Sequence, residues 1–146
     1  MKCSVKIDKD ALEDEVIIIA KEKSKKIFQL ENYILGLESE FIGYKEKEAT
    51  KLSLNDIYCF TIEENRVVAI TEKERYTIKE RLYNVETLLT DNFLRINQST
   101  IVNINKIDRF NASFVGSLMI IMKNGFKDFV SRRQLKKVKE KIGGKA

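Results

Sequence analysis

Residues 93–107 read FLRINQSTIVNINKI, and this stretch decides the fold because it sets a cluster of small polar side chains between two apolar runs. The first run begins at Phe93, and the second extends from Ile101 to Ile107. Such polar side chains favour turns and helix caps, and they also hydrogen-bond to bases and phosphates. The cluster is therefore a turn, a helix cap or a contact for a partner. We call it the polar knot, and its members are Asn97, Gln98, Ser99 and Thr100.

The chain becomes strongly basic from the knot onward. Residues 93–146 contain 12 Lys/Arg and 3 Asp/Glu, a net charge of +9, whereas residues 1–40 and residues 41–92 each have a net charge of −2. The net charge of +5 for the whole chain hides this asymmetry. A local excess of positive charge is the expected footprint of a polyanionic partner.

The basic C-terminal end reads SRRQLKKVKEKIGG and indicates a helix that Ser131 caps and Gly143 closes. Arg132 and Arg133 fall in its first turn, where the helix dipole disfavours positive charge. A phosphate or a base edge that receives them would justify this placement, since Arg forms forked hydrogen bonds to both. The rest of the helix has a thin apolar stripe formed by Leu135, Val138 and Ile142.

From Phe41 onward the sequence is a series of short apolar segments separated by two to five polar residues. This spacing favours antiparallel strands, because parallel strands require long crossover connections. We expect tight hairpin turns at residues 63–66 and at Asn124-Gly125, and a short amphipathic helix over residues 80–89. The expected strands are residues 41–45, 49–53, 58–64, 66–71, 75–79, 93–96, 106–111, 117–123 and 126–130.

The first 40 residues predict a separate β-β-α unit. Residues 2–8 alternate polar and apolar side chains, and residues 15–20 are rich in β-branched residues, so both are expected to be strands. From Ser24 to about Leu37 the apolar residues recur at helical spacing. One long helix from Ala11 to Leu37 is the alternative. A unit of this size is too small to be stable alone, so it needs the rest of the chain or a second copy.

Composition narrows the function classes. With 43% hydrophobic and 34% charged residues the chain is typical of a globular protein, and its longest apolar run (16–20) is too short to cross a bilayer. No segment resembles a signal peptide, so we expect a cytoplasmic protein that does not bind membranes. The absence of histidine removes the commonest general base, and Cys3 and Cys59 lie too far apart for a zinc motif. We therefore expect two reduced thiols, no cofactor, no metal and no catalysis.

The motifs taken together resemble the LytTR DNA-binding domain of bacterial transcriptional regulators. The resemblance rests on FLRINQSTIVNINKI, on KNG at residues 123–125, on VSRRQLKKVKEKIG at residues 130–143, and upstream on LNDIYCF and RLYNVETLL. It covers about residues 41–144. It implies an elongated, mainly β fold of antiparallel sheets with short helices, in which loops enter successive major grooves and pairs of copies bind repeated sites. A phosphoacceptor receiver domain, frequent in that family, does not fit the first 40 residues.

The resemblance also implies three contact loops. They correspond to the hairpin around Asn65 and Arg66, the polar knot, and the start of the last helix. Family members can carry histidines in the first two loops, and this chain has none. The candidate DNA-binding residues are Asn65, Arg66, Asn97, Gln98, Ser99, Lys123, Asn124, Arg132, Arg133, Lys136 and Lys137.

We therefore expect a sequence-specific regulator of transcription that binds double-stranded DNA at promoter repeats as a homodimer. Residues 41–146 form the DNA-binding domain, and residues 1–40 are a candidate dimerisation element. In this interpretation Lys123, Lys136 and Lys137 hold phosphates. The residues that approach base edges are Arg66, Asn97, Gln98 and Arg133. Two other classes share the basic end: an RNA-binding module, which usually shows aromatic side chains on a sheet face, and an adaptor that binds an acidic protein.

Overall fold

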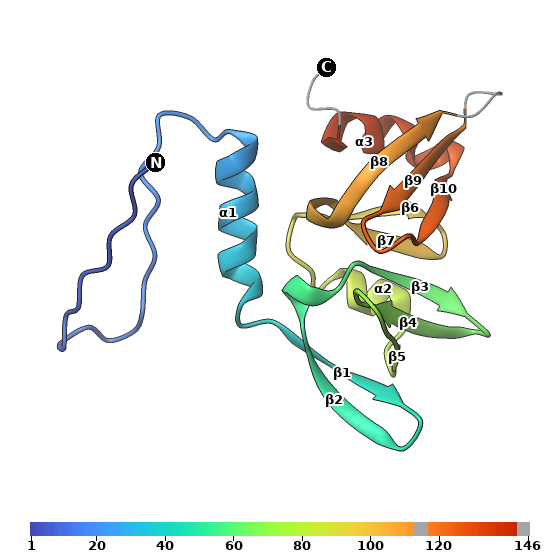
Figure 1. The fold of residues 1–146 in the computed structure, drawn as a ribbon, viewed down its shortest axis with the longest axis horizontal. Helices are drawn as coiled ribbons and strands as arrows, with labels where there is room; N and C mark the ends of the chain where they lie inside the picture. Colours follow the sequence, from blue (N-terminus) through green and yellow to red (C-terminus); the bar gives the residue numbers. More distant parts are fainter. Residues whose placement is uncertain (113–116, 143–146) are drawn as a thin grey trace.

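The computed structural model describes residues 1–112 and 117–142 and contains two antiparallel sheets (Figure 1). The larger sheet has seven strands in the order β2-β1-β5-β4-β3-β7-β6, and the smaller has three in the order β10-β9-β8. The mainly β, antiparallel fold with short helices is thus confirmed. The strands are β1 Glu40–Lys45, β2 Glu48–Ser53, β3 Cys59–Glu63, β4 Arg66–Ile70, β5 Arg75–Ile78, β6 Phe93–Asn97, β7 Thr100–Asn103, β8 Ile107–Ala112, β9 Leu118–Met122 and β10 Lys127–Val130.

The central strands are apolar on both faces because the larger sheet has a core on each side. In β4, Val67 and Ala69 belong to one core, and Val68 and Ile70 belong to the other. Side chains of a strand alternate between faces, so each neighbouring pair divides between the two cores. This explains why β4 reads as the unbroken run VVAI rather than as a polar–apolar alternation.

The first core lies against α2 (Leu82–Glu86), and Phe60 is at its centre. The Phe60 ring packs at tilted angles on Phe41, with centroids 5.2 Å apart, and on Phe93, with centroids 6.0 Å apart. Burying an aromatic side chain of this kind contributes about 1.5–3 kcal/mol. The second core lies between the larger sheet, the smaller sheet and α3 (Arg132–Ile142), and includes Ile96, Ile120, Met122, Val130 and Val138.

The expected strands and turns downstream of residue 40 are confirmed. Both ends of each strand lie within one residue of the expected bounds. The helix expected over residues 80–89 is shorter and ends at Glu86. The second apolar run after the knot, from Thr100 to Asn103, forms the strand β7. Two short 3-10 helices, η1 (Leu54–Asp56) and η2 (Ile104–Lys106), connect strands.

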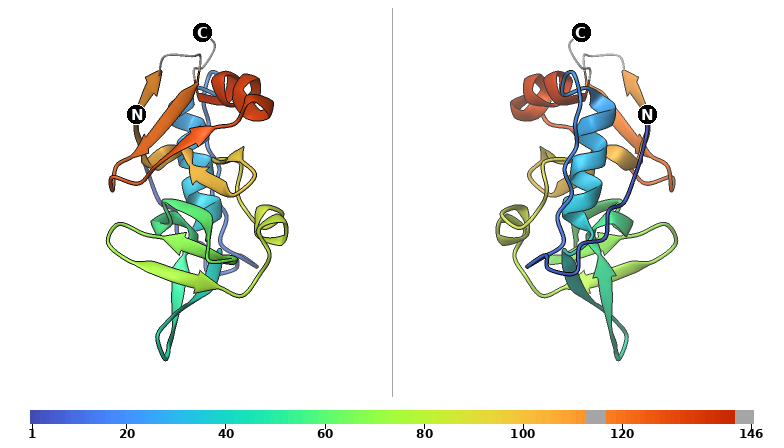
Figure 2. Two further views of the ribbon diagram at one scale, coloured as in Figure 1. Left: turned by 90° about the vertical axis from the view of Figure 1, so that its right-hand side faces the viewer. Right: turned by 90° about the vertical axis from the view of Figure 1, so that its left-hand side faces the viewer.

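Helix α1 (Lys25–Gly36) lies along one side of the body that the two sheets form (Figure 2). Polar contacts fix it there. The buried Asn32 side chain accepts a hydrogen bond from the backbone N–H of Asp91 at 3.0 Å. The side-chain amide of Asn55 donates to the carbonyl of Tyr33 at 2.9 Å. The helix begins where expected, because the Ser24 hydroxyl accepts from the N–H of its third residue.

The predicted strands at residues 2–8 and 15–20 are wrong. Both segments are extended but pair with no strand among the described residues, and almost every side chain in residues 1–23 is exposed. Strand-like composition does not suffice, because a strand needs a partner for its backbone groups. The alternative helix from Ala11 does not form either. We call residues 1–23 the arm, and Figure 1 shows it on the opposite side of α1 from the body.

Among residues 1–112 and 117–142, none of the helices has the length and apolar character needed to cross a lipid bilayer.

Candidate nucleic-acid interface

The polar knot is the turn of the β6–β7 hairpin. Asn97 pairs with Thr100 in the strand register, so Gln98 and Ser99 are the two turn residues. A register shift follows Arg95, which bends the strand just before the turn. Apolar residues of both strands are buried behind the turn and anchor it to the body: Leu94, Ile96, Ile101 and Val102.

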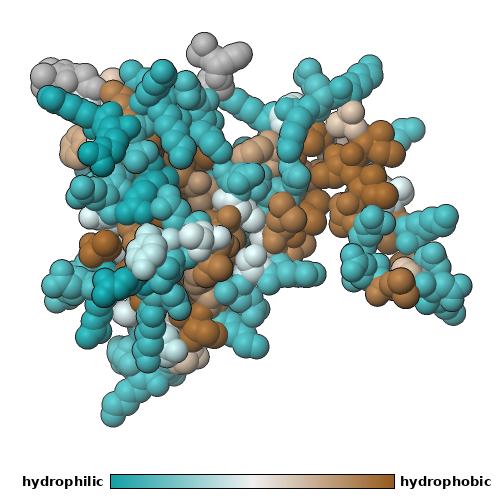
Figure 3. Space-filling view, turned by 180° about the vertical axis from the view of Figure 1, so that it is seen from behind, coloured by the Kyte–Doolittle hydropathy of each residue, from teal (hydrophilic) through white to brown (hydrophobic). Residues whose placement is uncertain are grey.

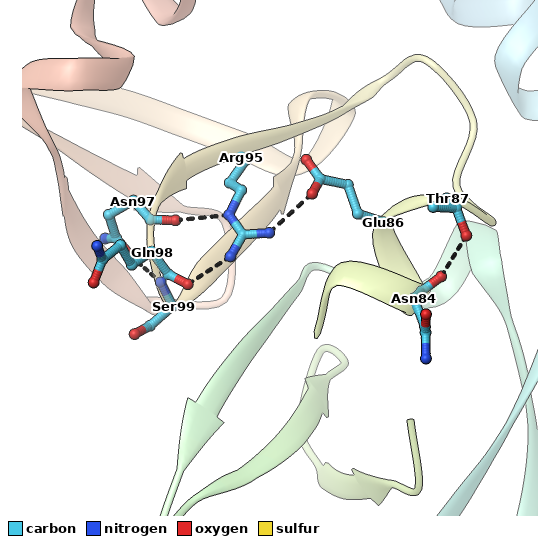
Figure 4. Close-up of polar contacts among 7 residues, drawn as sticks. All are labelled: Asn84, Glu86, Thr87, Arg95, Asn97, Gln98 and Ser99. Carbon is cyan, nitrogen blue, oxygen red and sulfur yellow. Dashed lines mark hydrogen bonds and ion pairs between the residues drawn. The ribbon is translucent and has the colours of Figure 1, made fainter. Parts of the chain in front are cut away.

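The Arg95 side chain holds the turn from behind (Figure 4). Its Nε donates to the carbonyl of Asn97 at 3.2 Å, and its Nη2 donates to the carbonyl of Gln98 at 2.6 Å. Its Nη1 donates to Glu86 Oε1 of α2 at 2.8 Å, which orients the guanidinium. Arg95 therefore fixes the backbone of the knot through its fork of donors.

Asp128 of β10 holds the knot from the other side. Its Oδ2 accepts from the Thr100 hydroxyl at 2.7 Å and from the Asn97 side-chain amide at 3.1 Å. The Thr100 oxygen also lies 2.8 Å from the Thr61 hydroxyl, in the buried part of the sheet. Hydrogen bonds to a carboxylate are stronger than those between neutral groups, so this network ties the knot to β3 and β10.

The two amide side chains of the knot differ sharply. Both Nδ2 hydrogens of Asn97 are used within the chain, by Asp128 and by the carbonyl of Phe129 at 2.8 Å. Asn97 Oδ1 accepts from the N–H of Ser99 at 2.8 Å. The Gln98 side chain, by contrast, is exposed and has no hydrogen-bond partner among the described residues. Asn97 shapes the turn, and Gln98 is the amide that the turn presents.

The start of α3 is attached to the same hairpin. The backbone N–H of Ser131 donates to the carbonyl of Ile96 at 2.9 Å, and the Ser131 hydroxyl accepts from the N–H of Gln134 at 3.3 Å. The expected cap is confirmed, while the expected closure at Gly143 lies outside the described residues. The stripe of Leu135, Val138 and Ile142 packs into the second core, which turns the basic side chains outward.

These contacts bring two of the three expected loops together. One hollow is lined by side chains of the knot and of the start of α3. Arg132 and Arg133 are exposed and form no ion pair within the described part of the chain. The residues that line the hollow are Arg95, Asn97, Gln98, Ser99, Ser131, Arg133 and Gln134.

The third expected loop is the β3–β4 turn. Glu64 and Asn65 both have positive φ, 50° and 63°, as a two-residue hairpin turn of the primed type requires. Because Thr61 of β3 pairs with Thr100 of β7, this turn projects on the same side as the knot (Figure 1). Arg66 is exposed there, and its guanidinium has no ion-pair partner among the described residues.

Lys123 and Asn124 lie apart from the side of the molecule that carries the knot and the β3–β4 turn. They form the β9–β10 turn, at the end of β10 that is far from the knot. The Asn124 side chain donates to the carbonyl of Thr71 at 2.8 Å and accepts from the N–H of Phe126 at 3.0 Å. The expected hairpin turn is confirmed, and the Asn124 amide stabilises it.

The LytTr DNA-binding domain family matches residues 47–143 of the chain. The chain belongs to this family. A LytTr DNA-binding domain of a putative methyl-accepting/DNA response regulator from Bacillus cereus has the same fold, with a TM-score of 0.68 and 21% identity. The match covers 73% of this chain and 98% of that one. The suspected LytTR resemblance is confirmed, and DNA binding is the activity of the family.

Two proteins of Staphylococcus aureus, from strain NCTC 8325 / PS 47 and strain N315, are each 28% identical to this chain over 144 residues. Each match covers 97% of this chain and 98% of the relative, so it extends over the arm and α1 as well as the LytTr domain. Both are described as uncharacterized HTH-type transcriptional regulators.

The described part of this LytTr chain contains no helix-turn-helix. Within residues 1–112 and 117–142, strands separate each of the helices α1, α2 and α3 from the next. We call the side of the molecule that carries the three candidate loops the contact face, and its exposed polar groups come from two strand turns and one helix start. Glu86, Arg95 and Asp128, to which no sequence motif gives a role, hold the knot in place.

The cysteines take no part in this face. Cys59 is buried in the second core, and burial raises the pKa of its thiol well above the usual range. A buried thiol of this kind is inert and packs as a small apolar side chain. Cys3 is exposed in the arm, and both cysteines are free.

Proposed function

We propose that this LytTr protein is a transcriptional regulator that recognises specific sites in double-stranded DNA through loops placed in the major groove. The observation that supports the proposal is the hollow shared by the knot and the start of α3, which both Gln98 and Arg133 line. An amide and a guanidinium are the side chains best suited to adenine and guanine edges. Internal hydrogen bonds hold the backbone of the knot and of the start of α3, so binding costs little backbone conformational entropy.

In the proposed arrangement Gln98 and Arg133 contact base edges, and Asn97 positions Gln98. Ser99 lines the hollow and Arg132 begins α3, and both contact the sugar–phosphate backbone. Lys136 and Lys137 are exposed on α3 and neutralise phosphates, which sets the salt dependence of binding.

The β3–β4 turn supplies the second point of contact. Asn65 and Arg66 project on the same side as the knot, and we assign them to the neighbouring major groove. Lys123 and Asn124 are left out of the contact face because they lie at the far end of β10.

In this proposal the protein acts in the cytoplasm and catalyses no reaction. Pairs of copies occupy repeated promoter elements. Residues 41–146 serve as the DNA-binding domain, and residues 1–40 hold two copies together.

Selection of binding sites from random duplex DNA tests this function, followed by affinity measurements on the selected duplex over a range of salt concentrations. The expected result is one enriched sequence that is bound about 10³-fold or more tightly than random duplex. An adaptor for acidic proteins would instead bind all duplexes alike, with an affinity that depends only on salt. Preference for single-stranded RNA over duplex DNA would indicate the RNA-binding class.

A further inference from the structure

The second segment of the arm, residues 15–20, is apolar on both faces. Val16, Ile18 and Ala20 line a half-open hollow together with Ile27 and Ile34 of α1. Side chains alternate along an extended chain, so the residues between them point away from α1. The first face of the segment is therefore turned toward α1. The second face can be buried only by a different surface.

The second face is formed by Ile17 and Ile19. Their side chains are 72% and 94% exposed, although isoleucine is among the residues most often found buried. Figure 3 shows apolar side chains gathered over the arm, at the margin of the molecule. A segment that is apolar on both faces is typical of a strand buried between two layers.

The backbone of the arm is also unpaired. Within residues 1–20 the described hydrogen bonds all lie in one turn, where Asp8 accepts from the N–H of Asp10 and of Ala11. The extended segments on either side of that turn keep free N–H and C=O groups. Free strand backbone of this kind is a template for pairing with another chain.

The exposed area of the chain is larger than a compact monomer requires. A compact protein of 17.0 kDa exposes about 7,700 Å², whereas this chain exposes 11,025 Å². Obligate homodimers cover about 1,000–2,500 Å² on each chain. The excess is large enough for an interface of that class.

The charge of the arm suits a second copy better than a polyanion. Residues 1–23 contain five lysines and six Asp/Glu, so both signs are present in nearly equal number. A mixed-charge surface can be complementary to itself in a two-fold interface. The arm also lies on the opposite side of the molecule from the knot and the β3–β4 turn, so an interface there leaves the contact face free (Figure 1).

We infer that the arm and the outer face of α1 form a homodimer interface, in which the segment of residues 15–20 pairs with the arm of a second copy. The partner covers Ile17 and Ile19 and provides hydrogen bonds for the free backbone. This inference gives a surface to the pairing of copies proposed above. Its test uses no DNA, so a failure of pairing and a failure of sequence-specific binding are separate results.

The test compares the wild type with an Ile17→Asp, Ile19→Asp double variant of the full chain by sedimentation equilibrium. Both side chains are exposed in the single chain, so the variant keeps the fold, which circular dichroism checks. Leu88→Asp is the matched control, since Leu88 is 59% exposed and lies after α2, outside the arm. We expect a dimer for the wild type and the control, and a dissociation constant about 100-fold higher or more for the double variant.

A wild type that stays monomeric at about 100 μM overturns the inference, and so does a double variant that dimerises as tightly as the wild type. Amide hydrogen exchange gives a second measurement on the unmodified chain. Residues 15–20 should be protected at high protein concentration and should lose protection on dilution. Protection that does not change with concentration would mean that the arm folds back on its own chain, and would also overturn the inference.

Discussion

Asp128 Oδ2 lies 3.1 Å from Asn97 Nδ2, so a carboxylate of β10 holds the amide that begins the β6–β7 turn. The two residues are 31 positions apart in the sequence. The same oxygen accepts from the buried Thr100 hydroxyl. Both ends of the turn therefore depend on one negatively charged side chain within an otherwise basic region.

Replacing Asp128 with alanine should destabilise the protein and blur its sequence preference. The change leaves the Thr100 hydroxyl without its carboxylate and one Asn97 amide hydrogen unpaired, which costs about 1–3 kcal/mol of unfolding free energy. Loss of a negative charge near DNA should strengthen binding to random duplex, while the loosened turn weakens specific binding. Urea unfolding and fluorescence anisotropy on both kinds of duplex measure the two effects.

The control for Asp128 is Asp108→Ala, which removes the same charge from an exposed carboxylate beside Arg109 on β8. Its unfolding free energy should stay within about 0.5 kcal/mol of the wild type. If the two variants gave the same ratio of specific to random affinity, the positioning role of Asp128 would be refuted.

Alanine substitutions at Asn97 and Gln98 should distinguish the residue that holds the shape of the turn from the residue that contacts DNA. Gln98→Ala removes a side chain with no internal partner, so stability should change by less than about 0.5 kcal/mol, while specific binding weakens by about 1–3 kcal/mol. Asn97→Ala should lower both, because its amide makes three hydrogen bonds within the chain. Thermal unfolding with titrations on the selected duplex provides the comparison. A large loss of stability in Gln98→Ala would contradict the assignment.

Arg133→Ala and Lys137→Ala should differ in the kind of affinity that they lose. The arginine variant should weaken specific binding by about 1–3 kcal/mol and relax discrimination at one base position. The lysine variant should weaken binding to all duplexes alike and reduce the salt slope by about one unit. Lys51→Ala is a control with the same charge change, since Lys51 is exposed on β2 at the sheet edge opposite β6, and it should alter neither. Equal losses on specific and random duplex for both variants would disprove the division of roles.

The buried thiol of Cys59 should make stability fall at alkaline pH. Its pKa is raised in the folded chain, while a thiol of the unfolded chain ionises near pH 8.5, at about the value in model peptides. The folded state therefore holds a proton that the unfolded state loses, and the contribution is present below pH 8.5 and is lost as the pH rises. Between about pH 9 and pH 10 the wild type should lose about 1 kcal/mol more unfolding free energy than Cys59→Ala. Urea unfolding at both pH values measures this, and parallel losses would show that the thiol ionises in the folded chain.

The strands and turns of the LytTr domain could be predicted because their signals are local. The helix cap at Ser131 and the turn at Asn124-Gly125 are examples in which two neighbouring residues decide the structure. The two cores on opposite faces of the larger sheet could not be read in the same way. A run such as VVAI in β4 indicates burial but not which neighbour covers each side chain.

The network around the knot could not be predicted because its parts meet only in the folded chain. Asp128 and Thr61 lie on β10 and β3, which reach the knot through the two sheets. Asn97 and Gln98 therefore look equivalent in the sequence and differ in the structure. The two strands predicted within the first 20 residues were wrong for a related reason, since a strand-forming composition does not provide a partner.

The alternation of β4 side chains between the two cores bears on the design of variants. Val67 faces the core beside α2, and its neighbour Val68 faces the core that includes residues of α3. Replacing Val67 or Val68 with alanine should therefore lower the unfolding free energy through different neighbours, namely Phe60 and α2 for Val67 and α3 for Val68. Both cores also meet at the β6–β7 hairpin, since Ile101 belongs to the first and Ile96 to the second, so the knot depends on the packing of both faces of one sheet.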